Sequence, residues 1–277
     1  QPFFFNLMEF LFRWSSNAAE VASRLPFSSL SFAKPSLLFA ILLLCTILGL
    51  FYFWNTRSKK QDVRALVLSI TLLSIHYNEQ LWSPYGEIIF IDVGQGDSIL
   101  IKQPFGGGVY LIDTGGILRF GEEEWQKRNN VFEPGEHIVV PFLKSKGIRT
   151  IDKLILTHDD QDHIGGAVAV LNGIDVKEIV IPEVLKEEFR TTALVNEAVK
   201  QEIKVDMLKT GDGWKKRGDT FTVLHPDTYK GDSNESSLVL YARINGMKWL
   251  FTGDMGKESE TVLTREWPKL EVDYLKV

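Results

Sequence analysis

The chain has 277 residues, of which 44% are hydrophobic and 24% charged, a composition that excludes an intrinsically disordered protein. Its 31 Lys and Arg against 36 Asp and Glu give a net charge of −5, which excludes a protein that is basic throughout but leaves local basic patches open. The single cysteine, Cys45, excludes an intrachain disulfide and a cysteine-rich zinc site, so a metal site must use His, Asp and Glu.

The two ends predict a piece of a longer protein. The chain starts at Gln1 rather than Met, and it stops inside the alternating run 272–277, which is typical of a strand. Apolar side chains recur along residues 1–25 with helical spacing. A helix at a membrane interface and a helix packed on other membrane helices both fit, so we treat residues 1–35 as an amphipathic or membrane-associated segment.

Residues 36–85 are predicted to form two transmembrane helices joined by a basic loop. Residues 37–54 carry no charge, and a helix of that length rises about 27 Å at about 1.5 Å per residue, close to the bilayer core thickness; a buried core helix is the alternative. Residues 55–64 hold four basic residues and one acid, which predicts a cytoplasmic loop. Residues 65–82 form a weaker second span, with an interfacial or buried helix as the alternative.

Residues 86–277 are predicted to form one α/β or α+β domain with a substantial core, because short β-rich runs alternate with turn residues and helical stretches. The strands are expected at 88–91, 98–102, 109–112, 153–156, 178–181, 220–224, 238–244 and 248–251, and the helices near 137–147, 163–172, 184–202 and 256–266.

The strongest chemical signal is the run Thr157-His-Asp-Asp-Gln-Asp-His-Ile-Gly-Gly166, between a buried strand and a helix. The run holds two histidines and three aspartates in six residues. Its carboxylates would repel one another unless a divalent cation is bound, and imidazole with carboxylate suits zinc, manganese or iron. A solvated acidic helix cap is the alternative. Asp113 and Asp254 follow two further apolar runs beside glycines, so we expect both at the same site.

These residues resemble the metallo-β-lactamase superfamily. The loop at 158–163 is similar to its HxHxDH signature with Asp160 in place of the second histidine, and the runs that end at Asp113 and Asp254 fit the same pattern. More narrowly, residues 90–98 (FIDVGQGDS) resemble the opening of the hydrolase-like domain of the ComEC family of DNA-uptake channels, and the apolar segments before it fit that family too.

The resemblance implies an α/β fold of the αββα four-layer sandwich type, incomplete at its C-terminus and preceded by transmembrane helices, with further ligands after Val277. It implies two divalent metal ions, Mn²⁺ or Zn²⁺ with Mg²⁺ as a third option. His158 and Asp160 match ligands of the first ion, Asp162 and His163 ligands of the second, and Asp254 the bridging carboxylate. Asp162 and Asp254 are thus the catalytic candidates.

Three further features are candidates for supporting roles. Asp113 matches an acid that orients a ligand, and Asp97 is a weaker candidate for the same role. The basic run Lys215, Lys216 and Arg217 is expected on a loop, where it either touches a phosphate backbone or is only solvated. His225 is expected to be structural.

The resemblance implies the C-terminal part of a competence DNA-uptake channel in a bacterial cell membrane, multi-pass, with an extracytoplasmic nuclease domain that degrades the non-transported strand. The expected partners are DNA, the membrane, other competence DNA-uptake proteins and the rest of its own channel domain. Two alternatives stay open: a non-catalytic DNA-guiding module, and a membrane-anchored hydrolase of small molecules.

Overall fold

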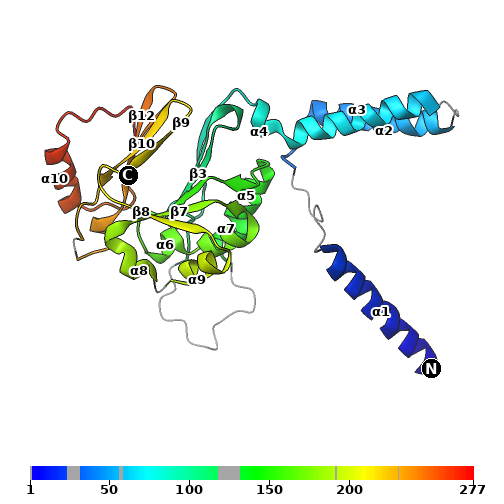
Figure 1. The fold of residues 1–277 in the computed structure, drawn as a ribbon, viewed down its shortest axis with the longest axis horizontal. Helices are drawn as coiled ribbons and strands as arrows, with labels where there is room; N and C mark the ends of the chain where they lie inside the picture. Colours follow the sequence, from blue (N-terminus) through cyan, green and yellow to red (C-terminus); the bar gives the residue numbers. More distant parts are fainter. Residues whose placement is uncertain (1, 24–31, 56–58, 118–131, 191, 230) are drawn as a thin grey trace.

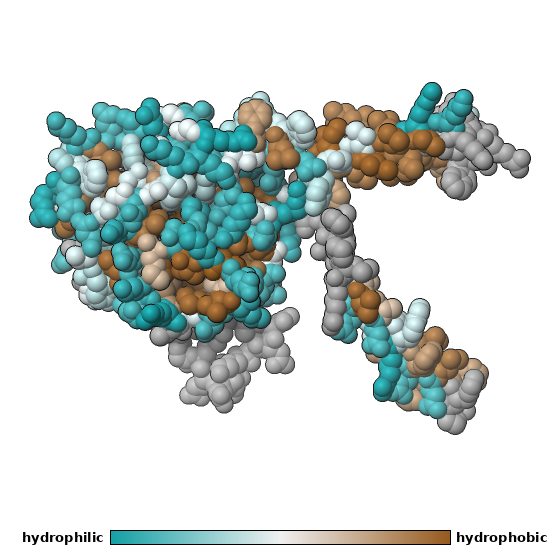
Figure 2. Space-filling model, in the orientation of Figure 1, coloured by the Kyte–Doolittle hydropathy of each residue, from teal (hydrophilic) through white to brown (hydrophobic). Residues whose placement is uncertain are grey.

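The computed structural model describes residues 2–23, 32–55, 59–117, 132–190, 192–229 and 231–277. Helix α1 (Pro2–Ser23) extends away from the rest, and α2 (Leu37–Asn55) and α3 (Lys59–Tyr77) lie side by side as a hairpin next to the globular part (Figure 1). Figure 2 shows that apolar side chains cover much of this hairpin.

The two predicted transmembrane helices are not supported: within the described ranges, no helix is both long enough and apolar enough to cross a membrane. The expected basic loop 55–64 also differs from the structure, because α3 already begins at Lys59 and takes the charged residues Asp62 and Arg64 into its first turns. The helices themselves lie close to where the apolar runs predicted them.

The hairpin is joined to the globular part by hydrogen bonds around the short helix α4 (Glu79–Trp82). Arg149 Nη1 donates to the Tyr77 carbonyl at 2.6 Å, and its guanidinium lies 3.6 Å from the centre of the Tyr77 ring. Gln80 Nε2 donates to the Gly147 carbonyl at 2.7 Å. The end of the hairpin therefore has a defined contact with the domain that follows.

Two sheets form the centre of the domain. The first has the order β1-β2-β3-β5-β7-β8, in which β3, β5, β7 and β8 are parallel neighbours. Its strands are β1 (Glu87–Phe90), β2 (Ile99–Lys102), β3 (Val109–Ile112), β5 (Lys153–Ile155), β7 (Glu178–Pro182) and β8 (Lys204–Leu208). Every residue of β3 is buried, as expected of a strand covered on both faces.

The second sheet has the order β13-β12-β11-β10-β9, with β13 parallel to β12 and the other pairs antiparallel. Its strands are β9 (Gly213–Lys216), β10 (Asp219–His225), β11 (Val239–Ile244), β12 (Met247–Phe251) and β13 (Tyr274–Lys276). A separate two-stranded ladder pairs β4 (Thr150–Ile151) with β6 (Asp175–Val176).

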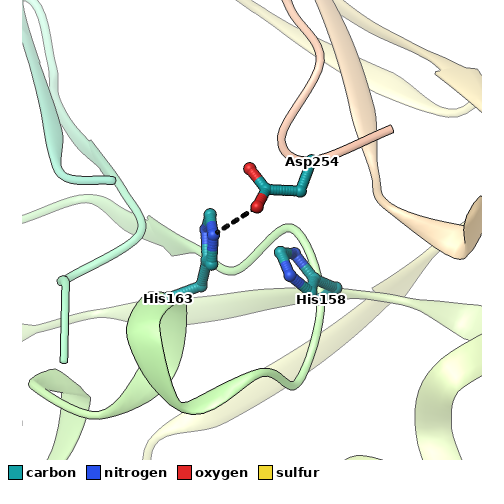
Figure 3. A group of neighbouring side chains, drawn as sticks. All are labelled: His158, His163 and Asp254. Carbon is teal, nitrogen blue, oxygen red and sulfur yellow. Dashed lines mark ion pairs between the residues drawn. The ribbon is translucent and has the colours of Figure 1, made fainter. Parts of the chain in front are cut away.

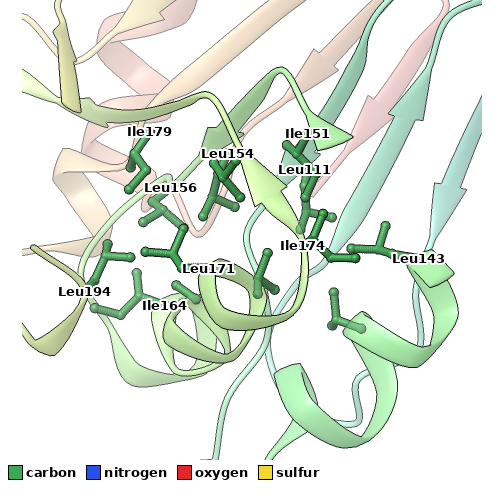
Figure 4. Close-up of a cluster of buried hydrophobic side chains, with 14 of the residues drawn as sticks. Leu111, Leu143, Ile151, Leu154, Leu156, Ile164, Leu171, Ile174, Ile179 and Leu194 are labelled. Carbon is green, nitrogen blue, oxygen red and sulfur yellow. The ribbon is translucent and has the colours of Figure 1, made fainter. Parts of the chain in front are cut away.

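Helices cover the outer faces of the sheets (Figure 1). The first sheet is covered by η3 (Gly135–Val139), α5 (Val140–Ser145), α7 (Ala167–Gly173), α8 (Lys186–Arg190) and α9 (Ala193–Lys200), and the second by α10 (Lys257–Glu266). Three apolar clusters fill the spaces between layers, and Figure 4 shows the largest, between the first sheet and its helices. This is the expected α-β-β-α order of layers.

Two segments differ from the sequence prediction. The expected helix 184–202 is divided into η4 (Glu183–Leu185), α8 and α9. The basic run that was expected on a loop lies mostly in strand β9, because residues 213–216 pair with residues 219–222 across a tight turn. Only Arg217 of that run is in the turn, at a φ of 51°.

Candidate metal centre

Strand direction brings the candidate residues together. Strands β3 and β5 are parallel, so Asp113 after β3 and the loop from Thr157 to His163 after β5 emerge at the same edge of the first sheet. The end of β12 in the second sheet supplies Asp254 at the same place (Figure 3). The short helix α6 (Gln161–Ile164) begins inside the loop and turns His163 back toward His158.

His158, His163 and Asp254 form a compact group of ligand atoms. Both imidazoles are buried and their ring centres are 4.1 Å apart. Asp254 Oδ2 lies 3.3 Å from His163 Nε2, and the Asp254 side chain is 43% exposed, so the group is open to solvent on one side. One nitrogen from each histidine and one oxygen from Asp254 all lie within 4.8 Å of one another.

Asp113 and Thr157 fix the orientation of both histidines. Asp113 is 1% exposed, and it accepts hydrogen bonds from Thr157 N at 2.8 Å, Thr157 Oγ1 at 2.7 Å and His163 Nδ1 at 2.9 Å. Because the Thr157 hydroxyl gives its one hydrogen to Asp113, it must accept from His158 Nδ1, 3.0 Å away. Both histidines therefore carry a hydrogen on Nδ1 and turn Nε2 toward Asp254.

The two Nε2 atoms are the ones that a metal would bind. Both are buried. Among the residues that the structure describes, His158 Nε2 has no hydrogen-bond partner, and His163 Nε2 faces only the Asp254 carboxylate, 3.3 Å away. Buried polar atoms are rarely left in this state. Two imidazole nitrogens and one carboxylate oxygen form a donor set that binds zinc, manganese or iron, so the residues present fit a divalent cation.

The charges of the site also favour a cation between the histidines and Asp254. Burial opposes the charge on His163, but hydrogen bonds to Asp113 and Asp254 outweigh it and raise the pKa of His163 to about 10. Burial lowers the pKa of His158, and the charge on His163 lowers it further. The hydrogen bond from His163 lowers the pKa of Asp254. In the metal-free protein, a proton on His163 thus supplies the positive charge.

The remaining predicted ligands lie near this group without joining it. Asp160 Oδ2 is 3.6 Å from His158 Nε2, and burial raises the pKa of Asp160. Asp162 lies in the first turn of α6, and it belongs to neither of the two ligand groups found in the described part of the chain. Asp97 is in the second group, together with Asp113 and His163, and its carboxylate pairs with Lys276 of β13.

The glycine-rich turn between β1 and β2 packs directly on the histidine loop. Gly96 has a φ of +69°, and a Cβ there would lie 1.7 Å from the carbonyl oxygen of Asp162. Gly115 N also donates to the carbonyl of Asp97 at 2.7 Å. The turn at 92–98 therefore supports the loop that carries the ligands, which gives a physical reason for its glycines.

Sequence reasoning missed two residues that the structure places at the site. Thr157 links Asp113 to His158, and its position directly before the motif was the available signal. Lys276 reaches Asp97 from a strand 179 residues further on, a pairing for which the sequence holds no signal. His225 is buried and its Nε2 lies 2.9 Å from the carbonyl of Glu235, in agreement with a structural role.

Residues 91–274 match the family model "Metallo-beta-lactamase superfamily". The chain is 34% identical to ComE operon protein 3 of Bacillus subtilis over 99% of its own length and 35% of that protein. It is 29% identical to Recombination protein 2 of Haemophilus influenzae, over 75% of this chain and 23% of that protein. It is also 29% identical to Competence protein ComA of Neisseria gonorrhoeae, over 64% and 21%. The chain thus spans about a third or less of these relatives.

Proposed function

Because the chain belongs to the metallo-beta-lactamase superfamily, we propose that it is the hydrolytic part of a competence DNA-uptake protein and cleaves phosphodiester bonds in incoming DNA, on the strand that is not transported. The names of its relatives support the competence role. The observation that carries the hydrolytic role is the pair of buried Nε2 atoms on His158 and His163 that face the Asp254 carboxylate.

In this proposal the side chains of the site have separate tasks. Asp113 and Thr157 hold the hydrogen on Nδ1 of each histidine, so that both Nε2 lone pairs stay available. Asp254 is partly exposed and faces both the histidines and solvent, so its carboxylate can bind a metal ion and accept a proton. A bound divalent metal would lower the pKa of a water molecule and stabilise negative charge on the phosphate oxygens.

We propose two divalent ions, as the family resemblance implies. His158, His163 and Asp254 would hold one of them, and the second would draw on the carboxylates around this group, where Asp160 and Asp162 lie on the same loop. The carboxylates make the whole site rich in oxygen, which favours Mn²⁺ relative to a site made of histidines. We therefore expect Mn²⁺ to bind at least as well as Zn²⁺, which titration calorimetry with each ion measures.

Substitution of Asp254 tests the proposed chemistry. With Mn²⁺ added, Asp254→Ala is expected to lower the rate of DNA cleavage by roughly 10²-fold or more, because it removes a ligand on the open side of the site. Asp175→Ala is the matched control, since Asp175 is an exposed carboxylate at the start of β6, outside the site. Equal cleavage by Asp254→Ala and the unaltered protein would rule out this site.

The same assay separates the alternatives. A protein that binds DNA but cleaves none with Mn²⁺, Zn²⁺ or Mg²⁺ would be a DNA-guiding module. A protein that hydrolyses small esters or lactones but not phosphodiesters would be a small-molecule hydrolase. The extracytoplasmic location stays a prediction. A reporter enzyme that is active only after export, fused after Gly86, tests it, and activity of this fusion would agree with that location.

A further inference from the structure

A second charged pocket lies at the opposite end of the strands from the metal centre. It has a volume of about 390 Å³ and is lined by the first residue of β5, by the residues just before β5 and β7, and by residues of β3, β7, β8 and β9. Four of the lining side chains are lysines, namely Lys153, Lys177, Lys204 and Lys216. This is an unusual concentration in a chain whose net charge is −5.

Two carboxylates hold the four lysines in place without neutralising them. Asp152 Oδ1 contacts both Lys177 Nζ at 2.8 Å and Lys216 Nζ at 3.1 Å. Glu178 pairs with Lys153 through one oxygen and with Lys204 through the other. Each carboxylate draws two ammonium groups together. Lys204 Nζ also contacts Asp206 Oδ2 at 3.5 Å, so four lysines against these three carboxylates leave a net charge of +1.

Both carboxylates are ionised at neutral pH, so the excess charge persists. Burial opposes ionisation of Asp152, but hydrogen bonds from Lys177, the Val109 N–H and Lys216 outweigh it and lower the pKa of Asp152. Burial likewise opposes ionisation of Glu178, and its two lysines outweigh it and lower the pKa of Glu178.

The aromatic walls of the pocket offer no ring face for a base. Trp214 stacks on Phe221 with ring centres 4.7 Å apart, and Lys153 Nζ lies 5.1 Å from the Trp214 ring centre. Tyr110 is 1% exposed, and burial raises its pKa to about 12, so its hydroxyl stays neutral. The pocket therefore recognises negative charge and not base identity, as lysine contacts to phosphates do.

We propose that this pocket binds the phosphate backbone of a nucleic-acid strand, with its two exposed lysines, Lys177 and Lys204, contacting adjacent phosphodiesters. The choice of nucleic acid as the source of phosphate rests on the proposed function. Five residues of β5 and its following loop lead from Lys153 to His158, or up to roughly 17 Å at about 3.3 Å per residue. A strand that occupies both sites would therefore span about five nucleotides at about 3.4 Å each.

Charge removal that spares the carboxylates tests the proposal. In Lys177→Gln/Lys204→Gln, Asp152 keeps Lys216 and Glu178 keeps Lys153, so the pocket loses two positive charges while both of these acids stay paired. Lys177 and Lys204 are 60% and 66% exposed, so folding is expected to survive. The control is Lys144→Gln/Lys200→Gln, which removes the same charge from exposed positions on α5 and α9.

The measurement is the binding of the full chain to a labelled single-stranded oligothymidylate in EDTA, as a function of salt. Without metal no cleavage occurs, so the result does not depend on whether the metal centre is catalytic. Loss of two phosphate contacts should reduce the magnitude of the slope of log K against log salt by about 1.4. If the variant and the unaltered protein bind alike at about 1 M salt, the variant should bind roughly 25-fold more weakly at about 0.1 M salt. The control should keep the slope of the unaltered protein.

Three results would overturn the proposal: an unchanged slope in the pocket variant, an equal change in the control, or binding of inorganic phosphate at the pocket without competition from the oligonucleotide. Loss of binding to vesicles that contain phosphatidylglycerol, with oligonucleotide binding intact, would assign the pocket to a lipid surface instead. A pocket variant with the expected slope but no DNA cleavage in any metal would support the pocket and reject the proposed hydrolysis.

Discussion

Replacement of Asp113 by Asn keeps the shape of the side chain that supports the metal centre but removes its negative charge. The buried Asp113 carboxylate accepts three hydrogen bonds, two of them at Oδ2, from Thr157 Oγ1 and His163 Nδ1. An asparagine amide has one oxygen and one NH₂ group. In the first orientation the NH₂ takes the Oδ1 position, where it faces another donor, the Thr157 N–H. In the second orientation the NH₂ takes the Oδ2 position, where it faces the hydrogen on His163 Nδ1.

The second orientation has a direct effect on metal binding. His163 must move its hydrogen to Nε2, and the Thr157 hydroxyl is then free to donate to His158 Nδ1, so that His158 changes tautomer too. Loss of a carboxylate that supports a metal-binding histidine typically weakens metal affinity by about 10- to 100-fold, or about 1.4 to 2.8 kcal/mol. The first orientation leaves a buried N–H unpaired, at a cost of about 1–3 kcal/mol in stability.

The assay pairs calorimetric titration of Zn²⁺ and Mn²⁺ with urea unfolding in EDTA. Asp113→Asn should lose metal affinity, stability or both in these amounts, and NMR of the histidine nitrogens should show which tautomer is present. Asp152→Asn is the matched control, since this carboxylate also accepts a backbone hydrogen bond but lies at the other end of the strands, so it should keep full metal affinity. Unchanged metal affinity and stability in Asp113→Asn would refute the role assigned to Asp113.

Four further predictions concern the metal centre and the rest of the domain. Gly96→Ala should unfold the turn at 92–98 and weaken metal binding, because its Cβ would lie 1.7 Å from the Asp162 carbonyl oxygen. In the control, Gly94→Ala, the new Cβ has nothing within 4 Å, so the positive φ alone should lower the free energy of unfolding by about 1–2 kcal/mol. Urea unfolding of both variants separates the steric contact from the backbone strain. Because the pKa of His163 is raised to about 10, metal affinity should rise between about pH 7 and 10, by up to about tenfold per pH unit for one released proton, as titrations at several pH values measure. The same raised pKa stabilises the metal-free protein fully below His163's ordinary value of 6.5, and this contribution is lost as pH rises toward 10, so thermal unfolding in EDTA should occur at lower temperature there. Leu154→Ala should cost about 2–5 kcal/mol in urea unfolding, because Leu154 is fully buried, and an exposed control, Leu275→Ala, should cost far less.

Much of the domain could be predicted from local pattern. The eight expected strands all exist to within one or two residues, because each is a short apolar run ended by turn residues. The match to the family model and the similarity to ComE operon protein 3, Recombination protein 2 and Competence protein ComA confirm the resemblance to the ComEC family. Strands β8 and β9 were missed, since Lys204–Leu208 and Gly213–Lys216 mix charged and apolar residues at the edges of their sheets, where burial is incomplete.

The candidate site could be predicted only in part. The histidine loop and the two distant aspartates have signals in the sequence, and the structure brings His158, His163, Asp113 and Asp254 together. The pairing of Asp97 with Lys276 and the charge balance around Asp152 depend on which strands become neighbours, which no local pattern contains. The Nδ1 hydrogens that Asp113 and Thr157 fix likewise follow from three-dimensional contacts.

The pair of Asp97 and Lys276 has a consequence for the order in which the domain is assembled. The two residues are 179 positions apart, and β13, which carries Lys276, is held by parallel pairing to β12. During synthesis, the turn at 92–98 leaves the ribosome 179 residues before this partner. Contacts at such long range form late and slowly. Until β13 has paired with β12, the turn that supports the metal ligands is therefore held by its contacts with the histidine loop and Gly115, without the ion pair to Lys276.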